Sequence, residues 1–240
     1  MTPDGKQEFR IQLVDALTNQ NIITSGGKAI VTAAGSAGKA TLYDSSGAAL
    51  SNPITPTRGF LNFFVGLDVS SVDLYIMCPG GQFLVAKSIV PGGPNDLFVD
   101  TSRLHQCMVI PVSADDVTAN TETATGFTEP ANALMLPTPF LDVGAIDATE
   151  TIDVGTLSSD SGDANGYIAA ASVATEGVVE AALANGAITL GALFVAQDSA
   201  NAGDGVPSPH VSAGKSITVT TSAGSDTVEA FVHLPYLLAA

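Results

Sequence analysis

The sequence predicts an all-β protein with two β-sandwich or barrel-like modules joined by a polar linker. Apolar and polar residues alternate over short runs, which is typical of strands with one buried face. Clusters of Gly, Pro, Asn and Ser separate these runs and indicate turns. Charged residues make up 13% of the 240 residues, whereas hydrophobic residues make up 45%. High hydrophobicity with few charges indicates a folded chain rather than a disordered one.

The first module is expected over residues 1–112. Its clearest element is a hairpin in which residues 72–77 and 82–87 flank Pro79-Gly80-Gly81. Proline presets one backbone angle of a tight turn, and glycine accepts the positive φ that such a turn needs. Shorter alternating or aromatic-rich runs predict further strands around residues 9–13, 40–44, 59–65 and 108–112.

Residues 113–133 are polar, rich in threonine and weakly periodic, and we interpret them as a linker or extended arm. One long surface loop within a single domain is the alternative. A second, acidic sandwich is expected over residues 134–240, where residues 216–221 and 227–234 alternate around a turn. Residues 173–184 are the one stretch that favours a short helix, although Gly177 weakens it.

The net charge of −16 is unevenly distributed along the chain. Residues 1–110 hold seven basic and eight acidic residues, whereas residues 111–240 hold sixteen acidic residues and a single basic one, Lys215. A phosphate-binding surface needs clustered Lys or Arg, so neither nucleic acid nor an anionic membrane is an expected partner. The alternative reading is that the acidity only keeps the protein soluble.

The sequence shows no targeting or redox signal. The N-terminal residues lack the apolar run of a secretory signal, and the longest apolar run, residues 188–196, is too short to span a membrane. Cys78 and Cys107 have no zinc-type spacing, and we expect them to be free thiols in a chain made in a reducing cytosol.

No catalytic residue or cofactor is expected, and the chain is not predicted to be an enzyme. His105, His210 and His233 are the only histidines, and a pair of Cys107 with a histidine lacks the third residue of a nucleophilic triad. No GxSxG, Walker or dinucleotide-binding motif follows a predicted strand. A hydrolase therefore stays a distant third alternative.

One turn carries a weak calcium signal. Ser161, Asp163, Asn165 and Gly166 follow the oxygen-ligand spacing of the first half of a calcium loop, and Asp160, Asp163 and Asn165 are the candidate ligands. Ser161 stands where such a loop has its leading carboxylate, and the bidentate acid at the far end is missing. Asp, Asn and Gly are also ordinary turn formers, so a plain turn is the alternative.

The scarcity of charge suggests surfaces that are covered in an assembly, because soluble monomers carry more charge. The chain ends on apolar residues, and Tyr236, Leu237 and Leu238 are candidate interface residues. We expect them to pack against a neighbouring subunit of a homo-oligomer, with a trimer as one candidate state, or against the module core. A last strand that ends in its own core is the alternative.

Several runs resemble β-modules of virion proteins of tailed bacteriophages. The resemblance rests on residues 40–44, 59–63, 72–75, 79–83, 147–155 and 162–166. It implies a non-enzymatic capsid decoration (cement) protein that binds the shell of major capsid protein and forms homo-oligomers. Such a protein is synthesised in the host cytoplasm and located at the capsid surface of the virion. A head-fibre or tail-associated adhesin is the alternative, and no functional residue transfers from the family.

Overall fold

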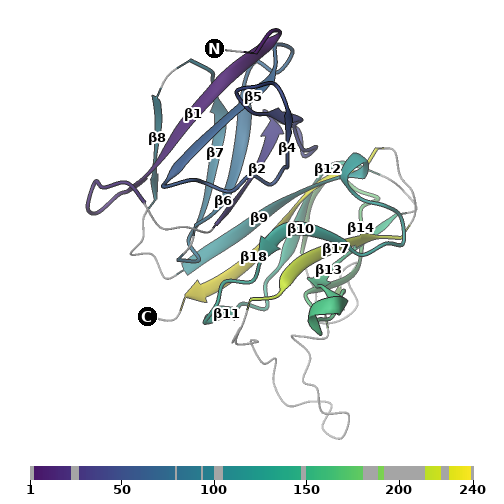
Figure 1. The fold of residues 1–240 in the computed structure, drawn as a ribbon. Coiled ribbons are helices and arrows are strands. Elements are labelled where there is room, and N and C mark those ends of the chain that lie inside the picture. Colours follow the sequence, from purple (N-terminus) through teal and green to yellow (C-terminus); the bar gives the residue numbers. More distant parts are fainter. Residues whose placement is uncertain are drawn as a thin grey trace, which may run out of the picture. The chain divides into compact units, whose positions relative to one another are not determined.

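The computed structural model describes residues 3–22, 27–78, 80–92, 94–99, 105–146, 150–180, 189–191, 214–222 and 227–238. The all-β prediction is confirmed: these residues form strands and two short 3-10 helices, without an α-helix among them (Figure 1). Accordingly, this part of the chain holds no helix that is long and apolar enough to cross a membrane. The chain divides into two compact units, residues 1–103 and 104–240.

The first unit contains two sheets. Sheet A has the order β4-β3-β5-β1-β8, in which β8 runs parallel to β1 and the other pairs are antiparallel. Its strands are β1 (Lys6–Asp15), β3 (Leu42–Tyr43), β4 (Ala49–Leu50), β5 (Phe60–Gly66) and β8 (Pro94–Val99). Sheet B is antiparallel and has the order β2-β6-β7, with β2 (Lys28–Ala33), β6 (Val72–Met77) and β7 (Phe83–Ile89). The predicted hairpin is therefore the β6–β7 pair.

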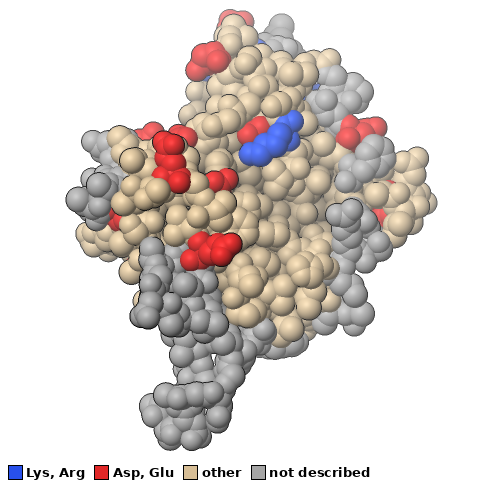
Figure 2. Space-filling view, turned by 180° about the vertical axis from the view of Figure 1, so that it is seen from behind, with Lys and Arg blue, Asp and Glu red and all other residues tan. Residues whose placement is uncertain are grey.

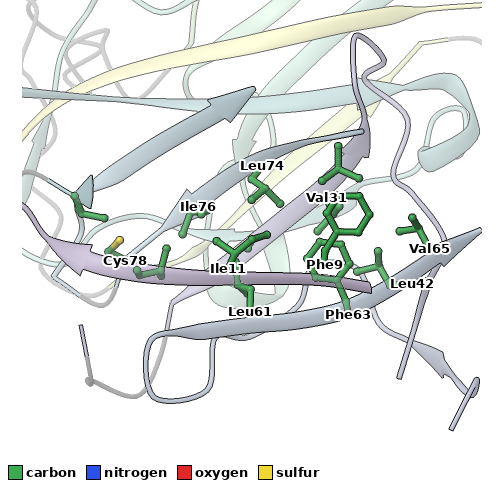
Figure 3. Packing of buried hydrophobic residues seen from close by; sticks show 14 residues of the cluster. Phe9, Ile11, Val31, Leu42, Leu61, Phe63, Val65, Leu74, Ile76 and Cys78 are labelled. Atoms are coloured by element: carbon green, nitrogen blue, oxygen red, sulfur yellow. The ribbon is translucent and has the colours of Figure 1, made fainter. Parts of the chain in front are cut away.

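Sheets A and B pack face to face around one apolar core (Figure 3). Alternate residues of each strand point into it, as the period of two requires. From sheet A, Phe9 and Phe63 stack with ring centroids 5.4 Å apart. From sheet B, Leu74 and Ile76 are fully buried. The first unit is thus a small β-sandwich.

The second unit also contains two sheets. Sheet C includes β9 (His105–Ser113), β11 (Ala133–Met135), β12 (Phe140–Ala145), β15 (Gly177–Glu180) and β18 (Glu229–Leu238). Sheet D has the order β10-β17-β13-β14-β16, with β10 (Thr123–Thr128), β13 (Thr151–Thr156), β14 (Ile168–Ser172), β16 (Thr189–Leu190) and β17 (Ser216–Thr221). The 3-10 helices η1 (Ala114–Asp116) and η2 (Ser158–Asp160) lie in connections. β18 is central in sheet C, because it pairs with β9 on one side and with β11 and β12 on the other.

The module boundaries differ from the prediction. β9 pairs along most of its length with β18, so residues 105–112 belong to the second unit rather than to the first. Residues 113–133, expected to be a linker or arm, hold η1, β10 and the start of β11. Thr125 and Phe127 of β10 are buried, and the Thr125 hydroxyl donates to the carbonyl of Ile217 at 3.0 Å. Threonine fits a pleated sheet once its hydroxyl is hydrogen-bonded. A strand therefore forms in a segment whose polar composition indicated a linker.

Residues 173–184, the stretch that favoured a short helix, also differ from the prediction. Residues 177–180 form β15, an antiparallel partner of β12. Gly177 has φ of 103°, which an α-helix does not accommodate. Residues 181–184 lie outside the described residues, as does most of the apolar run of residues 188–196.

The chain folds back closely on β13 at Gly155. A Cβ placed on Gly155 would lie 2.0 Å from the carbonyl oxygen of Asp163. That oxygen accepts a hydrogen bond from the N–H of Thr156 at 2.7 Å. The loop of residues 157–166 can therefore dock on the strand only where a side chain is absent.

Replacing Gly155 with alanine should destabilise the protein by about 1–3 kcal/mol, because the backbone of the loop must move away from the strand. Urea denaturation of the full chain measures the change. Gly144→Ala is the matched control, since a Cβ there would meet its nearest atom at an ordinary 3.7 Å. Equal stability of the two variants would contradict the close docking of the loop.

Candidate functional site

The candidate calcium loop is closed by hydrogen bonds within the protein. η2 ends at Ser161, which has left-handed backbone angles. Asp160 Oδ2 accepts a hydrogen bond from the N–H of Ser216 at 3.1 Å. Asp163 Oδ1 accepts one from the N–H of Asn165 at 3.3 Å. Two of the candidate ligands thus already accept hydrogen bonds from the backbone.

A lysine places a positive charge at the same loop. Lys215 Nζ donates to the carbonyl oxygen of Ser161 at 2.7 Å. In the part of the chain that the structure describes, no three His, Cys, Asp or Glu side chains gather closely enough to hold a metal ion. The arrangement fits a turn that Lys215 ties to the start of β17. Calcium binding by Asp160, Asp163 and Asn165 stays a prediction from the sequence.

A buried polar cluster joins three distant segments of the second unit. The Tyr167 hydroxyl donates to Glu129 Oε1, and Glu129 Oε2 accepts from the N–H of Lys215 at 3.1 Å. Tyr167 is fully buried, and Glu129 is nearly so. Burial raises the pKa of Tyr167, and the negative charge of Glu129 and the hydrogen bond to it raise it further. The phenol therefore stays neutral and acts as a donor.

Sequence reasoning missed this cluster. Glu129 lies in the stretch interpreted as a linker, 38 residues from Tyr167 and 86 from Lys215. A lone glutamate in a polar segment carries no local signal of burial. The pairing of β10 with β17 brings Glu129 beside Lys215, and the pairings of β13 with β17 and β14 bring Tyr167 to them.

The thiol–histidine pair is present, but its thiol is not activated. Cys107 Sγ lies 3.9 Å from His233 Nδ1, and the His233 ring stacks on Phe140 with centroids 4.2 Å apart. Burial raises the pKa of Cys107 to about 11. A nucleophilic cysteine needs a lowered pKa, so this thiol is poorly suited to covalent catalysis at neutral pH. His105 lies exposed at the start of β9, and His210 lies outside the described residues.

Both cysteines are free thiols. Cys78 is buried in the core of the first unit. Burial raises its pKa to about 11, which makes it as unreactive as a structural apolar residue.

A buried charge organises sheet B in the first unit. Asp73 accepts hydrogen bonds from the N–H groups of Ser88 at 2.8 Å and Gly35 at 3.1 Å, and from Lys87 Nζ at 3.0 Å. Lys87 also donates to the Tyr75 hydroxyl. Burial opposes ionisation of Asp73, but these hydrogen bonds and the Lys87 charge outweigh it and hold the pKa of Asp73 below its ordinary value.

The apolar C-terminal residues belong to β18 rather than to a free tail. Leu238, Leu237 and Tyr236 pair with Ala133, Leu134 and Met135 of β11. Tyr236 is fully buried within the chain, whereas Leu237 and Leu238 are partly exposed. Tyr236 thus packs in the core of its own unit, and a subunit contact made by Leu237 and Leu238 stays a prediction. The physical reason is that β18 continues between β9 and β11 to Leu238, which encloses the ring.

Comparison with known proteins finds no match for this chain among family models, curated protein sequences or solved structures.

Removing the Tyr167 hydroxyl should cost stability. Tyr167→Phe leaves the buried Glu129 carboxylate without one donor, so we expect a loss of about 1–3 kcal/mol in the free energy of unfolding. Thermal or urea denaturation measures it. Tyr43→Phe, at a half-buried tyrosine whose ring lies under Lys6, is the control and should change stability by less than about 0.5 kcal/mol. A Tyr167→Phe variant as stable as the control would contradict a stabilising role of the hydrogen bond between Tyr167 and Glu129.

The contribution of Asp73 should depend on pH. Because its folded pKa is lowered, its charge stabilises the protein above its unfolded pKa of about 3.9, and this stabilisation is lost as pH falls through the folded value. Asp73→Asn should cost about 2–4 kcal/mol at pH 7, and the difference from wild type should shrink as pH falls below the unfolded pKa of about 3.9.

Urea denaturation across this pH range tests the expectation. The exposed Asp68→Asn is the matched control. A constant difference between wild type and Asp73→Asn from pH 7 to pH 2.5 would show that ionisation of Asp73 contributes nothing.

Proposed function

We propose that the chain is a structural protein of a tailed-bacteriophage virion, namely a capsid decoration protein that binds the shell of major capsid protein. One observation carries the non-enzymatic part of the proposal. Several of the groups able to do chemistry in the described residues are engaged in structure. Carboxylates accept backbone hydrogen bonds, as at Asp73 and Asp160, and burial keeps the Cys107 thiol neutral.

The surface composition also supports an assembly protein. Figure 2 shows a face on which most described atoms belong to uncharged residues, with scattered acidic groups and little positive charge. Apolar side chains are exposed in both units, with Leu17, Leu67 and Val178 each more than half accessible. Low charge and exposed apolar groups are typical of the surfaces that become the buried centres of interfaces.

Such a protein would act by interfacial burial. A cap that contacts two neighbouring shell subunits must lose its interfaces before the subunits separate. At about 25 cal/mol per Å² of apolar area, each interface contributes several kcal/mol before the entropy of association is subtracted. No catalytic step is required, which agrees with the neutral thiols and hydrogen-bonded carboxylates.

The proposal predicts where the chain lies on the particle. Gold-labelled antibody against the chain should decorate the heads of purified phage particles, and shells lacking the chain should bind it and become more resistant to heat. The same antibody on particles stripped of the chain is the control. Label on tails or head fibres, with binding of the purified chain to host cells, would favour the adhesin instead.

A further inference from the structure

Sheet C has an outer face whose residues can be read from the strand register. Even-numbered residues of β18 from Ala230 to Tyr236 are buried, so the odd-numbered ones point to the opposite side. Phe231 lies opposite Asp142 of β12, which lies opposite Val178 of β15. Directly opposed residues in antiparallel strands share a face. These three residues therefore form one row across the sheet.

A second row lies two residues further along. His233 lies opposite Phe140, and Phe140 lies opposite Glu180. The stacking of the His233 ring on Phe140 confirms that these side chains share one face. In the first row the acidic Asp142 of β12 lies opposite the apolar Val178 of β15. In the second row the apolar Phe140 of β12 lies opposite the acidic Glu180 of β15.

The end of this face formed by β12 and β15 is accessible. Val178 is 63% exposed, Asp142 and Glu180 are exposed, and Phe140 is half-buried. β15 stands at the end of the strand order of sheet C. An exposed valine flanked by two carboxylates leaves apolar area in water, and a partner could cover that area only by compensating both charges.

Charge determines which partner fits. Residues 104–240 carry sixteen acidic residues and one basic residue, Lys215, which is tied to the Ser161 carbonyl. The same unit of a second copy would bring carboxylates against carboxylates, and such like-charge contacts are unfavourable. A partner with lysine or arginine beside apolar residues would neutralise Asp142 and Glu180 while it covers Val178 and Phe140.

We propose that the outer face of sheet C at β12 and β15 docks an extended segment of another protein. On the side of this segment that faces the sheet, at every second position, lysine or arginine alternates with apolar residues. The period of an extended chain matches the face, because side chains two residues apart point to the same side in both. This docking surface does not depend on the virion assignment.

The test uses the full chain and two synthetic peptides of equal length and fluorescent label. One peptide presents alternating Val and Lys on one side, and the other presents Val and Glu. Fluorescence anisotropy should give at least about tenfold tighter binding of the Val/Lys peptide, weakening as salt is raised. Equal affinities for the two peptides would overturn the proposal.

Two double variants distinguish peptide binding at this face from attraction to the general negative charge of the second unit. Asp142→Asn with Glu180→Gln should weaken binding of the Val/Lys peptide about tenfold. Asp115→Asn with Asp116→Asn removes two charges from η1 of the second unit and should weaken it about twofold or less. An equal loss from both double variants would mean that the peptide follows net charge alone, which overturns the proposal.

A variant and its matched control test the apolar contribution to peptide binding. Val178→Ser removes apolar area without changing the charge and should weaken binding of the Val/Lys peptide about fivefold, whereas Leu67→Ser, at a similarly exposed residue of the first unit, should leave binding unchanged. If Val178→Ser unfolds by circular dichroism, the isosteric double variant decides. A fall in the sedimentation mass of the chain alone on Val178→Ser would show that a second copy occupies this face, and this result also overturns the proposal.

Discussion

Carboxylate oxygens that accept hydrogen bonds from backbone N–H groups hold the connections of both units. Among the described residues, Asp15, Asp44 and Asp163 accept such bonds locally. Others bridge more distant segments, namely Asp73, Glu122, Glu129, Asp153 and Asp160. Every buried N–H needs an acceptor, and hydrogen bonds to an ionised carboxylate are stronger than those between neutral groups. A protein with 24 acidic but only eight basic residues can therefore anchor its loops with few ion pairs.

These hydrogen bonds give part of the acidity of the second unit a structural role. The negative charge of the second unit first suggested only a surface property, yet Glu122, Glu129 and Asp160 are bonded to the backbone near η2 and the start of β17. These acids have a structural role that is independent of any partner. Asp142 and Glu180 differ, because both are exposed beside Phe140 and Val178. The structure thus separates acids that build the fold from acids that are available to a partner.

The distinction between structural groups and accessible groups also bears on the proposed function. Enzymes leave reactive groups accessible with pKa values suited to proton transfer or attack. Here the Cys107 thiol has a raised pKa beside His233, and the Tyr167 phenol is a buried donor to Glu129. What remains at the surface is low in charge and partly apolar, which suits a protein that works by binding in an assembly.

The sequence alone was enough to determine the all-β class, the β6–β7 hairpin and the acidic character of the second half, because period-two alternation, Gly and Pro turns and net charge are local or additive properties. The unit boundary, the strand in the predicted linker and the burial of Tyr236 were decided by tertiary structure. β9 joins the second unit only because β18, more than a hundred residues later, pairs with it. Likewise, Glu129 is buried because β17 and Tyr167 reach it from distant segments. Such pairings depend on long-range register, which no local pattern of residues contains.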